Sequence, residues 1–225
     1  MMTIGGKFIV LDGTDGSGKK TQAKLLLKRL ADEGYKAGYY DFPQYGKTLF
    51  GDMTARYLNG EFGEADDVSP YFSSLLYAGD RWQAKDKIAE DIKNGKIIIS
   101  NRYTSSSMAF QTAKIKIKSL KKEYIKWIEK LEFETYKIPR PDLVLFLYVP
   151  FKISRTLVDK KDKRNYTDLK RDIHEKNDDF MQRAENEYLF LAKNHPDWKI
   201  INCCDENKIL PVEIIHQKIW KAIAA

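Results

Sequence analysis

The sequence has few of the residues that build disulfide scaffolds and metal clusters. Two of its 225 residues are cysteines, and they are adjacent, Cys203 and Cys204. Adjacent cysteines suit neither a metal site of separated ligand pairs nor an ordinary loop-closing disulfide. The three histidines, His174, His195 and His216, have no spacing that indicates a metal cluster. We therefore expect reduced, structural cysteines and a His174 that is solvated or caps a helix.

Long apolar runs are also missing. No run approaches the roughly 20 residues that span a bilayer. The first residues, MMTIGGKFIVLDG, lack the basic region, apolar core and cleavage site of a secretion signal. We therefore expect no membrane segment and a cytoplasmic location.

Positive charge exceeds negative charge, with 39 lysines and arginines against 32 aspartates and glutamates and a formal net charge of +7. Such a chain attracts anions, nucleotides and nucleic acids among them. One lysine-rich stretch could form a nucleic-acid surface: Lys114, Lys116, Lys118, Lys121 and Lys122. No recognition motif with interleaved aromatic residues accompanies it, so we do not expect a nucleic-acid partner.

Short apolar runs alternate along the chain with stretches of helical spacing. The runs typical of strands cover residues 7–12, 36–41, 96–100, 143–148 and 198–202. Helical spacing covers residues 19–30, and Ser69 and Gly95 are positioned to cap and stop a long helix over residues 70–94. Strands separated by helices imply crossover connections. The sequence predicts one α/β domain over residues 1–225, with a parallel sheet of about five strands between two helical layers.

A glycine-rich segment joins the first predicted strand to the first predicted helix. Residues 13–19 read GTDGSGK, which is the context in which backbone N–H groups and a helix N-terminus surround a phosphate. The glycines allow the chain to turn closely around the anion, and Lys19 would reach the β- and γ-phosphates of ATP. The pattern predicts a P-loop NTPase fold. The candidate ATP-binding residues are Gly13, Asp15, Gly16, Ser17, Gly18, Lys19, Lys20, Thr21 and Arg155.

The residue after Lys19 departs from this motif. The motif expects a serine or threonine that holds Mg²⁺, but this chain has Lys20, and Thr21 comes one residue late. An ammonium group cannot ligate a metal. Either Mg²⁺ is held through water and nucleotide oxygens, or the metal site is altered.

A polar segment over residues 158–171 is a candidate for a mobile lid. Basic residues at its start and within it could close over ATP and neutralise the charge that develops on the transferring phosphoryl group. They include Arg155, Lys160, Lys161, Lys163 and Arg164. Consecutive charges also occur at any solvated helix end.

Six segments follow one another in an order and spacing that resemble the thymidylate kinases. They are LDGTDGSGKKTQ, DFPQYGKT, LLYAGDRW, NRYTSSSMAFQ, PRPDLVLFLYVP and DIHE…Y, over residues 7 to 202. The resemblance implies transfer of the γ-phosphoryl group of ATP to dTMP, with Mg²⁺ as cofactor and a homodimer as the assembly. It assigns catalysis to Lys19, Arg102 and a lid cation, Lys163 or Arg164.

The same resemblance implies a dTMP site. Its residues are Asp15, Phe42, Pro43, Tyr77, Arg81, Arg102, Ser106, Ser107, Gln111 and Tyr188. Asp15 would face the sugar and phosphate, Arg102 the phosphates, and the pair Tyr77 and Arg81, four apart on one helix face, the thymine base. Phe110 would pack beneath the base. Tyr188 belongs to a helix expected to start at residues 172–175, whose core stripe is Phe180, Ala184, Tyr188 and Leu191.

Several positions differ from the family pattern. Asn101 replaces the aspartate of an Asp-Arg pair, which removes a charge that can attract Mg²⁺. Gln44 and Tyr45 stand where relatives often have an arginine for the acceptor phosphate, and Gly16-Ser17 where some have a catalytic arginine. The lid would then supply the catalytic cation.

Two alternatives therefore stay open. The chain could phosphorylate another nucleotide or a deoxynucleoside, because the base contacts are the less specific part of the pattern. Lys20 and Asn101 together also allow a nucleotide-binding protein that has lost catalysis.

Overall fold

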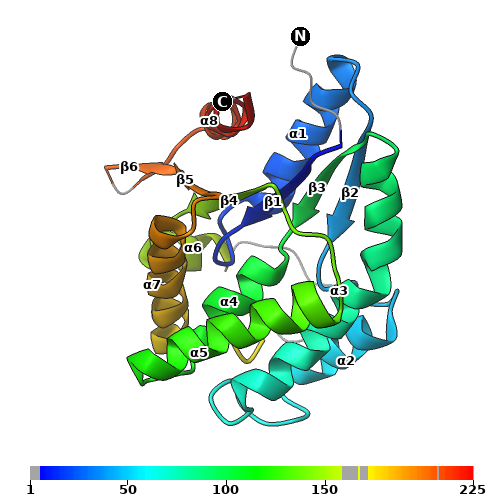
Figure 1. Cartoon of the computed structure of the whole chain (residues 1–225). Coiled ribbons are helices and arrows are strands. Elements are labelled where there is room, and N and C mark those ends of the chain that lie inside the picture. Colours follow the sequence, from blue (N-terminus) through cyan, green and yellow to red (C-terminus); the bar gives the residue numbers. More distant parts are fainter. Residues whose placement is uncertain (1–5, 159–166, 168–171, 207, 225) are drawn as a thin grey trace.

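The structure is a computed structural model that describes residues 6–158, 167, 172–206 and 208–224. A five-stranded parallel sheet forms its centre, in the order β2-β3-β1-β4-β5 (Figure 1). Its strands are β1 (Phe8–Asp12), β2 (Ala37–Asp41), β3 (Ile97–Asn101), β4 (Leu143–Tyr148) and β5 (Trp198–Asn202). The short strands β6 (Cys204–Asp205) and β7 (Lys208–Ile209) form a separate antiparallel pair. All five predicted strands of the sheet are confirmed.

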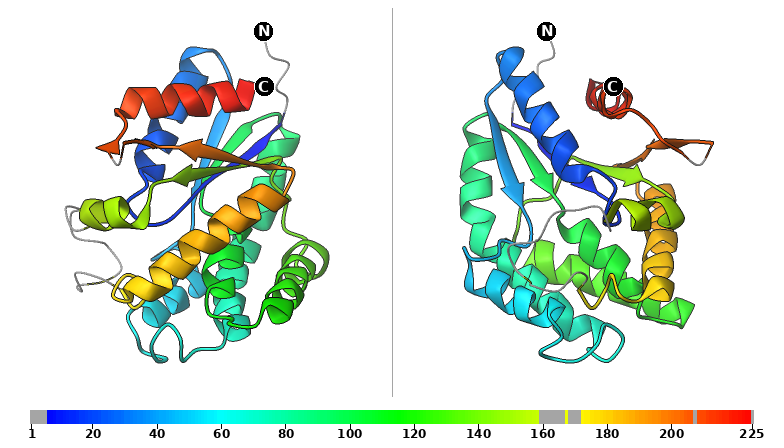
Figure 2. Two further views of the ribbon diagram at one scale, coloured as in Figure 1. Left: turned by 90° about the vertical axis from the view of Figure 1, so that its left-hand side faces the viewer. Right: turned by 180° about the vertical axis from the view of Figure 1, so that it is seen from behind.

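Helices cover both faces of this sheet. They are α1 (Lys19–Asp32), α2 (Leu49–Leu58), α3 (Pro70–Lys93), α4 (Thr104–Thr112), α5 (Lys118–Glu129), the π-helix η1 (Lys130–Thr135), α6 (Phe151–Val158), α7 (Asp178–Asn194) and α8 (Val212–Ala224). Helices α1 and α8 lie on one face, and α3, α4, α5 and α7 on the other (Figure 2). The predicted three-layer α/β fold is confirmed.

Each strand of the sheet's centre divides its side chains between two cores. In β1, Ile9 and Leu11 are buried with α1 and α8, whereas Phe8 and Val10 are buried with the helices of the opposite face. Because both faces are covered, every residue of β1 is buried, which explains the continuous apolar run in the sequence. Cys203 and Cys204 are free and buried on the α8 side, as the sequence predicts.

The long helix α3 ends as predicted but begins differently. At its C-terminus, Gly95 has a φ of 76°, its N–H donates to Ile92, and Lys96 N–H donates to Asp91, which is a Schellman motif. At the N-terminus, the side chain of Ser69 makes no capping hydrogen bond. Pro70 occupies the first helical position, where its fixed φ and missing N–H are tolerated without a cap.

Helix α7 starts later than the sequence suggests. Residues 173–176 form a turn instead of a helix, because the Asp172 carboxylate accepts the N–H groups of His174 and Glu175, each at 3.0 Å. The helix begins at Asp178, and the side chain of Asn177 caps it by accepting the N–H of Phe180 at 2.9 Å. The predicted core stripe of Phe180, Ala184, Tyr188 and Leu191 is buried. Of the predicted lid, residues 159–166 and 168–171 lie outside the described residues.

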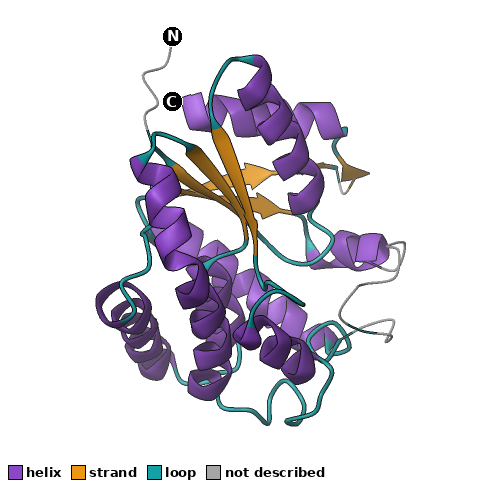
Figure 3. Cartoon of the chain, turned by 90° about the vertical axis from the view of Figure 1, so that its right-hand side faces the viewer, coloured by secondary structure: helices purple, strands orange, loops and turns teal. Residues whose placement is uncertain are grey.

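The loops that follow β1, β2 and β3 meet at the carboxyl edge of the sheet (Figure 3). The loop after β1 is also held by α6: a Cβ on Gly16 would lie 2.5 Å from the carbonyl oxygen of Ser154. The fold therefore fixes the glycine-rich loop both by backbone conformation and by close packing against α6.

We predict that Gly16→Ala destabilises the protein more than Gly34→Ala. The two glycines have nearly the same φ, +85° and +82°, but a Cβ on Gly34 meets nothing within 4 Å. Gly34→Ala should cost about 1 kcal/mol through backbone strain, and Gly16→Ala roughly 1–3 kcal/mol more. Urea unfolding of both variants measures the difference, and equal losses would contradict the packing described for Gly16.

Candidate active site

The glycine-rich loop forms a cradle at the N-terminus of α1. Gly13, Gly16 and Gly18 have φ values of 144°, 85° and 84°, which L side chains rarely adopt. The Lys19 ammonium lies over the loop, 3.0 Å from the carbonyl oxygen of Gly13 and 2.9 Å from that of Thr14. The loop, the N-terminus of α1 and the Lys19 ammonium thus lie together, in the arrangement that suits an anion.

A buried aspartate that the sequence analysis missed ties this loop to its surroundings. Asp12 is fully buried at the last position of β1. Its carboxylate accepts hydrogen bonds from the N–H of Gly13 and from the hydroxyls of Ser105, Ser106 and Tyr188. The position of Asp12, an acidic residue at the end of an apolar run, could have indicated this role, because a buried carboxylate requires hydrogen-bond donors around it.

Arg102 is held in the direction of the loop by a strained backbone. Its φ of 65° is uncommon for a residue other than glycine. Its Nη2 donates to Asp15 at 2.9 Å, and its Nη1 lies 3.6 Å from Asp12 and 3.3 Å from the Ser106 hydroxyl. The guanidinium therefore stands between the phosphate loop and the pocket beside it.

The sequence-predicted acceptor residues other than Tyr188 line this one pocket. They are Asp15, Phe42, Pro43, Tyr77, Arg81, Arg102, Ser106, Ser107 and Gln111, and Phe110 lies among them. The pocket is also lined by residues that were not predicted to bind the acceptor: Tyr45, Leu58, Asp80, Asp172 and His174. Asp15 and Arg102 mark the end near the loop.

Tyr188 does not edge the pocket, contrary to the expectation. It is fully buried, its ring stacks on Phe146 at 4.9 Å, and its hydroxyl donates to Asp12 at 2.7 Å. Burial raises the pKa of Tyr188 well above its ordinary value, so the hydroxyl stays a donor. It supports Asp12 and Arg102 from behind the site.

A buried ion pair holds Arg81 at the other end of the pocket. Its Nε donates to Glu132 at 2.7 Å and its Nη2 to the other Glu132 oxygen at 2.6 Å. Nη2 also donates to Ser107 at 2.8 Å, and Thr104 donates to Glu132 at 2.7 Å. Glu132 was missed because it belongs to η1, outside every motif in the sequence. The bidentate pair cancels the charge of Arg81 and fixes its plane.

Asp80, from the same helix, anchors the segment after β2. Its carboxylate accepts the N–H of Gln44 at 2.8 Å and the hydroxyl of Thr48. Burial raises its pKa above the ordinary value, against the effect of these hydrogen bonds. The peptide bond between Phe42 and Pro43, which also line the pocket, is cis. Asp80 thus positions the wall that the sequence assigns to Phe42 and Pro43.

We expected His174 to be solvated or to cap a helix, and the structure shows neither. It is 6% exposed, its ring is stacked against Phe110, and its Nε2 lies 3.1 Å from the hydroxyl of Tyr57. Burial and then the nearby charge of Lys114 lower its pKa to about 3, so the ring is neutral. The turn at Asp172 directs it into the pocket.

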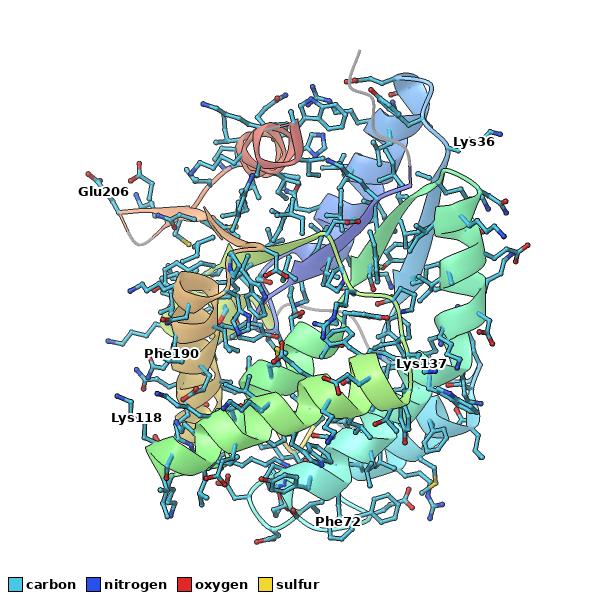
Figure 4. The ribbon with its side chains drawn as sticks, viewed as in Figure 1. Lys36, Phe72, Lys118, Lys137, Phe190 and Glu206 are labelled. Carbon is cyan, nitrogen blue, oxygen red and sulfur yellow. The ribbon has the colours of Figure 1, made fainter. Side chains whose placement is uncertain are left out.

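Lys114 belongs to the lysine-rich stretch that could have formed a nucleic-acid surface, but it lies apart from the other four lysines. Its side chain is half-buried, and its Nζ contacts Tyr57, Val68 and Ser73. Burial lowers its pKa to about 7. The other four lysines border a hollow between α5 and α7, where Figure 4 shows Lys118 and Phe190. Lys114 lies in the turn between α4 and α5, which directs it away from the other four lysines.

Among the described residues, no predicted lid cation is placed at the site. Lys163 and Arg164 lie outside them. Arg155, at the end of α6, is paired with Asp178 at the start of α7. The structure therefore gives Arg155 an ionic partner within the protein.

The described residues do not form a cage of ligands for Mg²⁺, so the ion would have to bind through other oxygens. Lys20 and Thr21 are exposed, and the described part of the chain has no group of three or more histidine, cysteine, aspartate or glutamate residues that could hold a metal ion. Asn101 donates to Asp41 at 2.6 Å, and its buried Oδ1 has no partner there. An acceptor of this kind fits a water molecule on Mg²⁺, whose common ligands are phosphate oxygens and water.

Comparison with known proteins decides between the families that share a glycine-rich loop. The family model described as thymidylate kinase matches residues 11–219. This chain belongs to the thymidylate kinase family. Among curated relatives in that family, the probable thymidylate kinase of Thermococcus kodakarensis is 31% identical over 217 residues, 94% of each chain. The thymidylate kinase of Schizosaccharomyces pombe is 34% identical over 151 residues, 67% of this chain and 65% of its own.

A solved thymidylate kinase has the same fold. The enzyme from Candida albicans matches with a TM-score of 0.73 at 23% identity, covering 97% of this chain and 91% of its own. In addition, none of the helices among the described residues is long and apolar enough to cross a membrane.

We predict that Glu132→Gln destabilises the protein by roughly 3–5 kcal/mol, because it leaves the Arg81 charge buried without a counter-ion. Replacing both partners, Arg81→Met with Glu132→Leu, should cost much less, since no charge then remains buried. Urea unfolding measures both. A Glu132→Gln variant as stable as the parent would show that the pair is not needed to neutralise Arg81.

We also predict that His174 makes stability depend on pH. Its pKa is about 3 in the folded chain and 6.5 ordinarily, so the unfolded chain binds the extra proton between these values. The free energy of unfolding should fall as the pH drops below about 6, by up to about 1.4 kcal/mol per pH unit from this group. Parallel unfolding at pH 6.5 and 4.5 should show a smaller fall in His174→Phe, and an equal fall would contradict the buried neutral ring.

Proposed function

We propose that this protein is an ATP-dependent kinase that transfers the γ-phosphoryl group of ATP to the phosphate of dTMP. The observation that carries the proposal is the position of Arg102 and Asp15, which border both the phosphate loop and the adjoining pocket. A donor phosphate on the loop and an acceptor phosphate in the pocket would meet at this pair. Family membership supports the choice of acceptor.

The proposed reaction needs positioning and charge neutralisation more than any covalent group. An oxygen of the dTMP phosphate attacks the γ-phosphorus, the bond to the β-phosphate oxygen breaks, and ADP leaves. Lys19 and the loop N–H groups hold the donor, and Arg102 holds the acceptor phosphate in line. We assign the closing cation to Lys163 or Arg164, which would also exclude water from ATP.

The ends of the proposed acceptor pocket differ in charge. Near the loop, the side chains of Arg102 and Asp15 are 15% and 27% exposed, and the guanidinium borders the pocket. At the far end, Glu132 is fully buried and saturates Arg81. A neutral base therefore suits the Arg81 end, beside the ring of Tyr77, and the charged phosphate suits the Arg102 end.

We propose Mg²⁺ as the cofactor, bound to the nucleotide phosphates and to water, where it neutralises part of their charge. The chain's contribution would be Asn101, as an acceptor for a metal-bound water, with Asp41 orienting its amide. Lys20 takes no part in metal binding.

A homodimer through α2 and α3 is part of the proposal. Large apolar side chains are exposed along these helices: Leu49 is 70% exposed, Phe72 71% and Trp82 44%. Figure 4 shows Phe72 at the outer edge of the helical layer. Exposed apolar area of this kind is typical of a protein interface. We place the protein in the cytoplasm, in keeping with the free cysteines.

The direct test is an ADP-release assay with ATP, Mg²⁺ and a panel of acceptors: dTMP, dUMP, dCMP, dGMP, AMP and GMP. We expect a dTMP-selective signal that Lys19→Ala reduces at least about a hundredfold, because the ammonium no longer stabilises the transferring group. The control Lys24→Ala, at an exposed position of the same helix outside the proposed site, should keep most of the activity.

Selectivity for another acceptor would keep the kinase and discard the thymine assignment. ATP binding without turnover of any acceptor would instead indicate a nucleotide-binding protein that has lost catalysis, the reading that Lys20 and Asn101 allow.

A further inference from the structure

One half-buried lysine, Lys114, begins two hydrogen-bond chains behind the pocket. The Nζ atom of Lys114 lies 2.7 Å from the hydroxyl of Tyr57, 3.2 Å from the carbonyl oxygen of Val68 and 3.2 Å from the hydroxyl of Ser73. An ammonium group has three N–H donors and no acceptor, so it satisfies all three oxygens at once. Lys114 thereby directs the protons of Tyr57 and Ser73 away from itself.

The first chain runs from Lys114 through Tyr57 to His174. The Tyr57 oxygen accepts from Lys114, which leaves its one proton for Nε2 of His174, 3.1 Å away. Tyr57 keeps that proton because burial raises its pKa far above the ordinary value. The neutral ring of His174 has one N–H, and since Nε2 accepts, the proton is on Nδ1. No described residue accepts from Nδ1, and the ring lines the pocket.

The second chain runs from Lys114 through Ser73 to Gln111. The Ser73 oxygen accepts from Lys114, and its own proton points to Oε1 of Gln111 at 2.7 Å. This contact fixes the amide so that the NH₂ group of Gln111 faces the other way. Gln111 also lines the pocket, and no residue in the described part of the chain accepts from its NH₂ group.

We propose that Lys114 is a positioning residue that orients both chains so that His174 and Gln111 present N–H donors to the acceptor base. A wall of donors pairs with the carbonyl oxygens of a pyrimidine-2,4-dione and rejects a ring that carries an amino group, because two donors would then face each other. The inference rests on the proposed function and adds to it the group that sets base selectivity without touching the substrate.

While Lys114 is an ammonium, it keeps the oxygens of Tyr57 and Ser73 as acceptors and directs their protons away from itself. The Ser73 proton then has three acceptors, Oε1 of Gln111 at 2.7 Å and the carbonyl oxygens of Ser69 at 3.1 Å and Pro70 at 3.4 Å, and the contact to Gln111 is the shortest of them. Without the cation, His174 can move its proton to Nε2 and Gln111 can rotate its amide. Each would then present an acceptor to the pocket, which is what an amino group needs.

The test compares kcat/KM for dTMP, dUMP and dCMP in the parent protein, in Lys114→Met and in the control Lys116→Met. Assays at pH 6 keep Lys114 charged, since its pKa is about 7. Lys116 is exposed and borders the hollow between α5 and α7 instead. We expect Lys114→Met to lower the dTMP-to-dCMP selectivity at least about tenfold, mostly through KM, while Lys116→Met leaves it unchanged. Unchanged selectivity in Lys114→Met would overturn the proposal.

Two further variants separate the chains and protect the test against misfolding of Lys114→Met. Tyr57→Phe removes only the link to His174, and Ser73→Ala only the link to Gln111, so each should lose part of the selectivity. If neither variant changes it, the proposal is overturned.

A structural readout does not depend on activity. Long-range ¹H–¹⁵N spectra, assigned with His174→Gln, should show the His174 proton on Nδ1 in the parent protein and partly on Nε2 in Lys114→Met. A proton on Nε2 in the parent would overturn the proposal. If the parent phosphorylates none of the pyrimidine nucleotides, the proposed function fails instead, and the tautomer result still stands by itself.

Discussion

The site depends on one buried negative charge, the carboxylate of Asp12. It ends β1 and receives hydrogen bonds from the first residue of the phosphate loop, from α4 and from α7. A carboxylate without water is costly unless such donors surround it, so these elements have to converge on that point. Arg102 completes the arrangement at 3.6 Å, on a backbone whose positive φ the surrounding contacts enforce. Asp12 thereby fixes the position of the loop relative to the pocket.

Both ends of the pocket use an arginine with a carboxylate, but solvent access gives the two pairs different roles. The pair of Arg81 with Glu132 is almost completely buried, so separating it would strand a charge, and it acts as a rigid, neutral element of the wall. The side chains of Arg102 and Asp15 are 15% and 27% exposed, and both residues line the pocket. This pair is therefore the more accessible of the two, and its guanidinium is the one that a phosphate could reach.

Patterns in the sequence were sufficient wherever a property is local. The strands β4 and β5 have the predicted bounds, β4 because Leu143–Tyr148 is a continuous apolar run, and the glycine spacing locates the phosphate loop. Motif resemblance brought together residues from four segments that do line one pocket. Helix ends were less certain, because Asp172 forms a turn of its own before Asn177 caps α7.

Long-range pairing could not be predicted in the same way. Glu132 reads as a surface acid of an amphipathic segment, and only the fold shows that it lies against Arg81. Lys114 reads as one of five solvated lysines, although it is the one whose ammonium is enclosed by three oxygens. The sequence predicted Tyr188 and not His174 at the pocket, and the structure shows the opposite for a related reason. The first packs into the pocket and the second behind it, and helical spacing does not distinguish these positions.

The central claim is that one pocket holds the acceptor with its phosphate at Arg102 and its base at Arg81. A crystal structure of the protein with dTMP bound tests it most directly. The account predicts the phosphate within hydrogen-bond distance of Arg102 and the base against Tyr77, Arg81 and Gln111. Binding of dTMP in the reverse orientation, or outside this pocket, would contradict it.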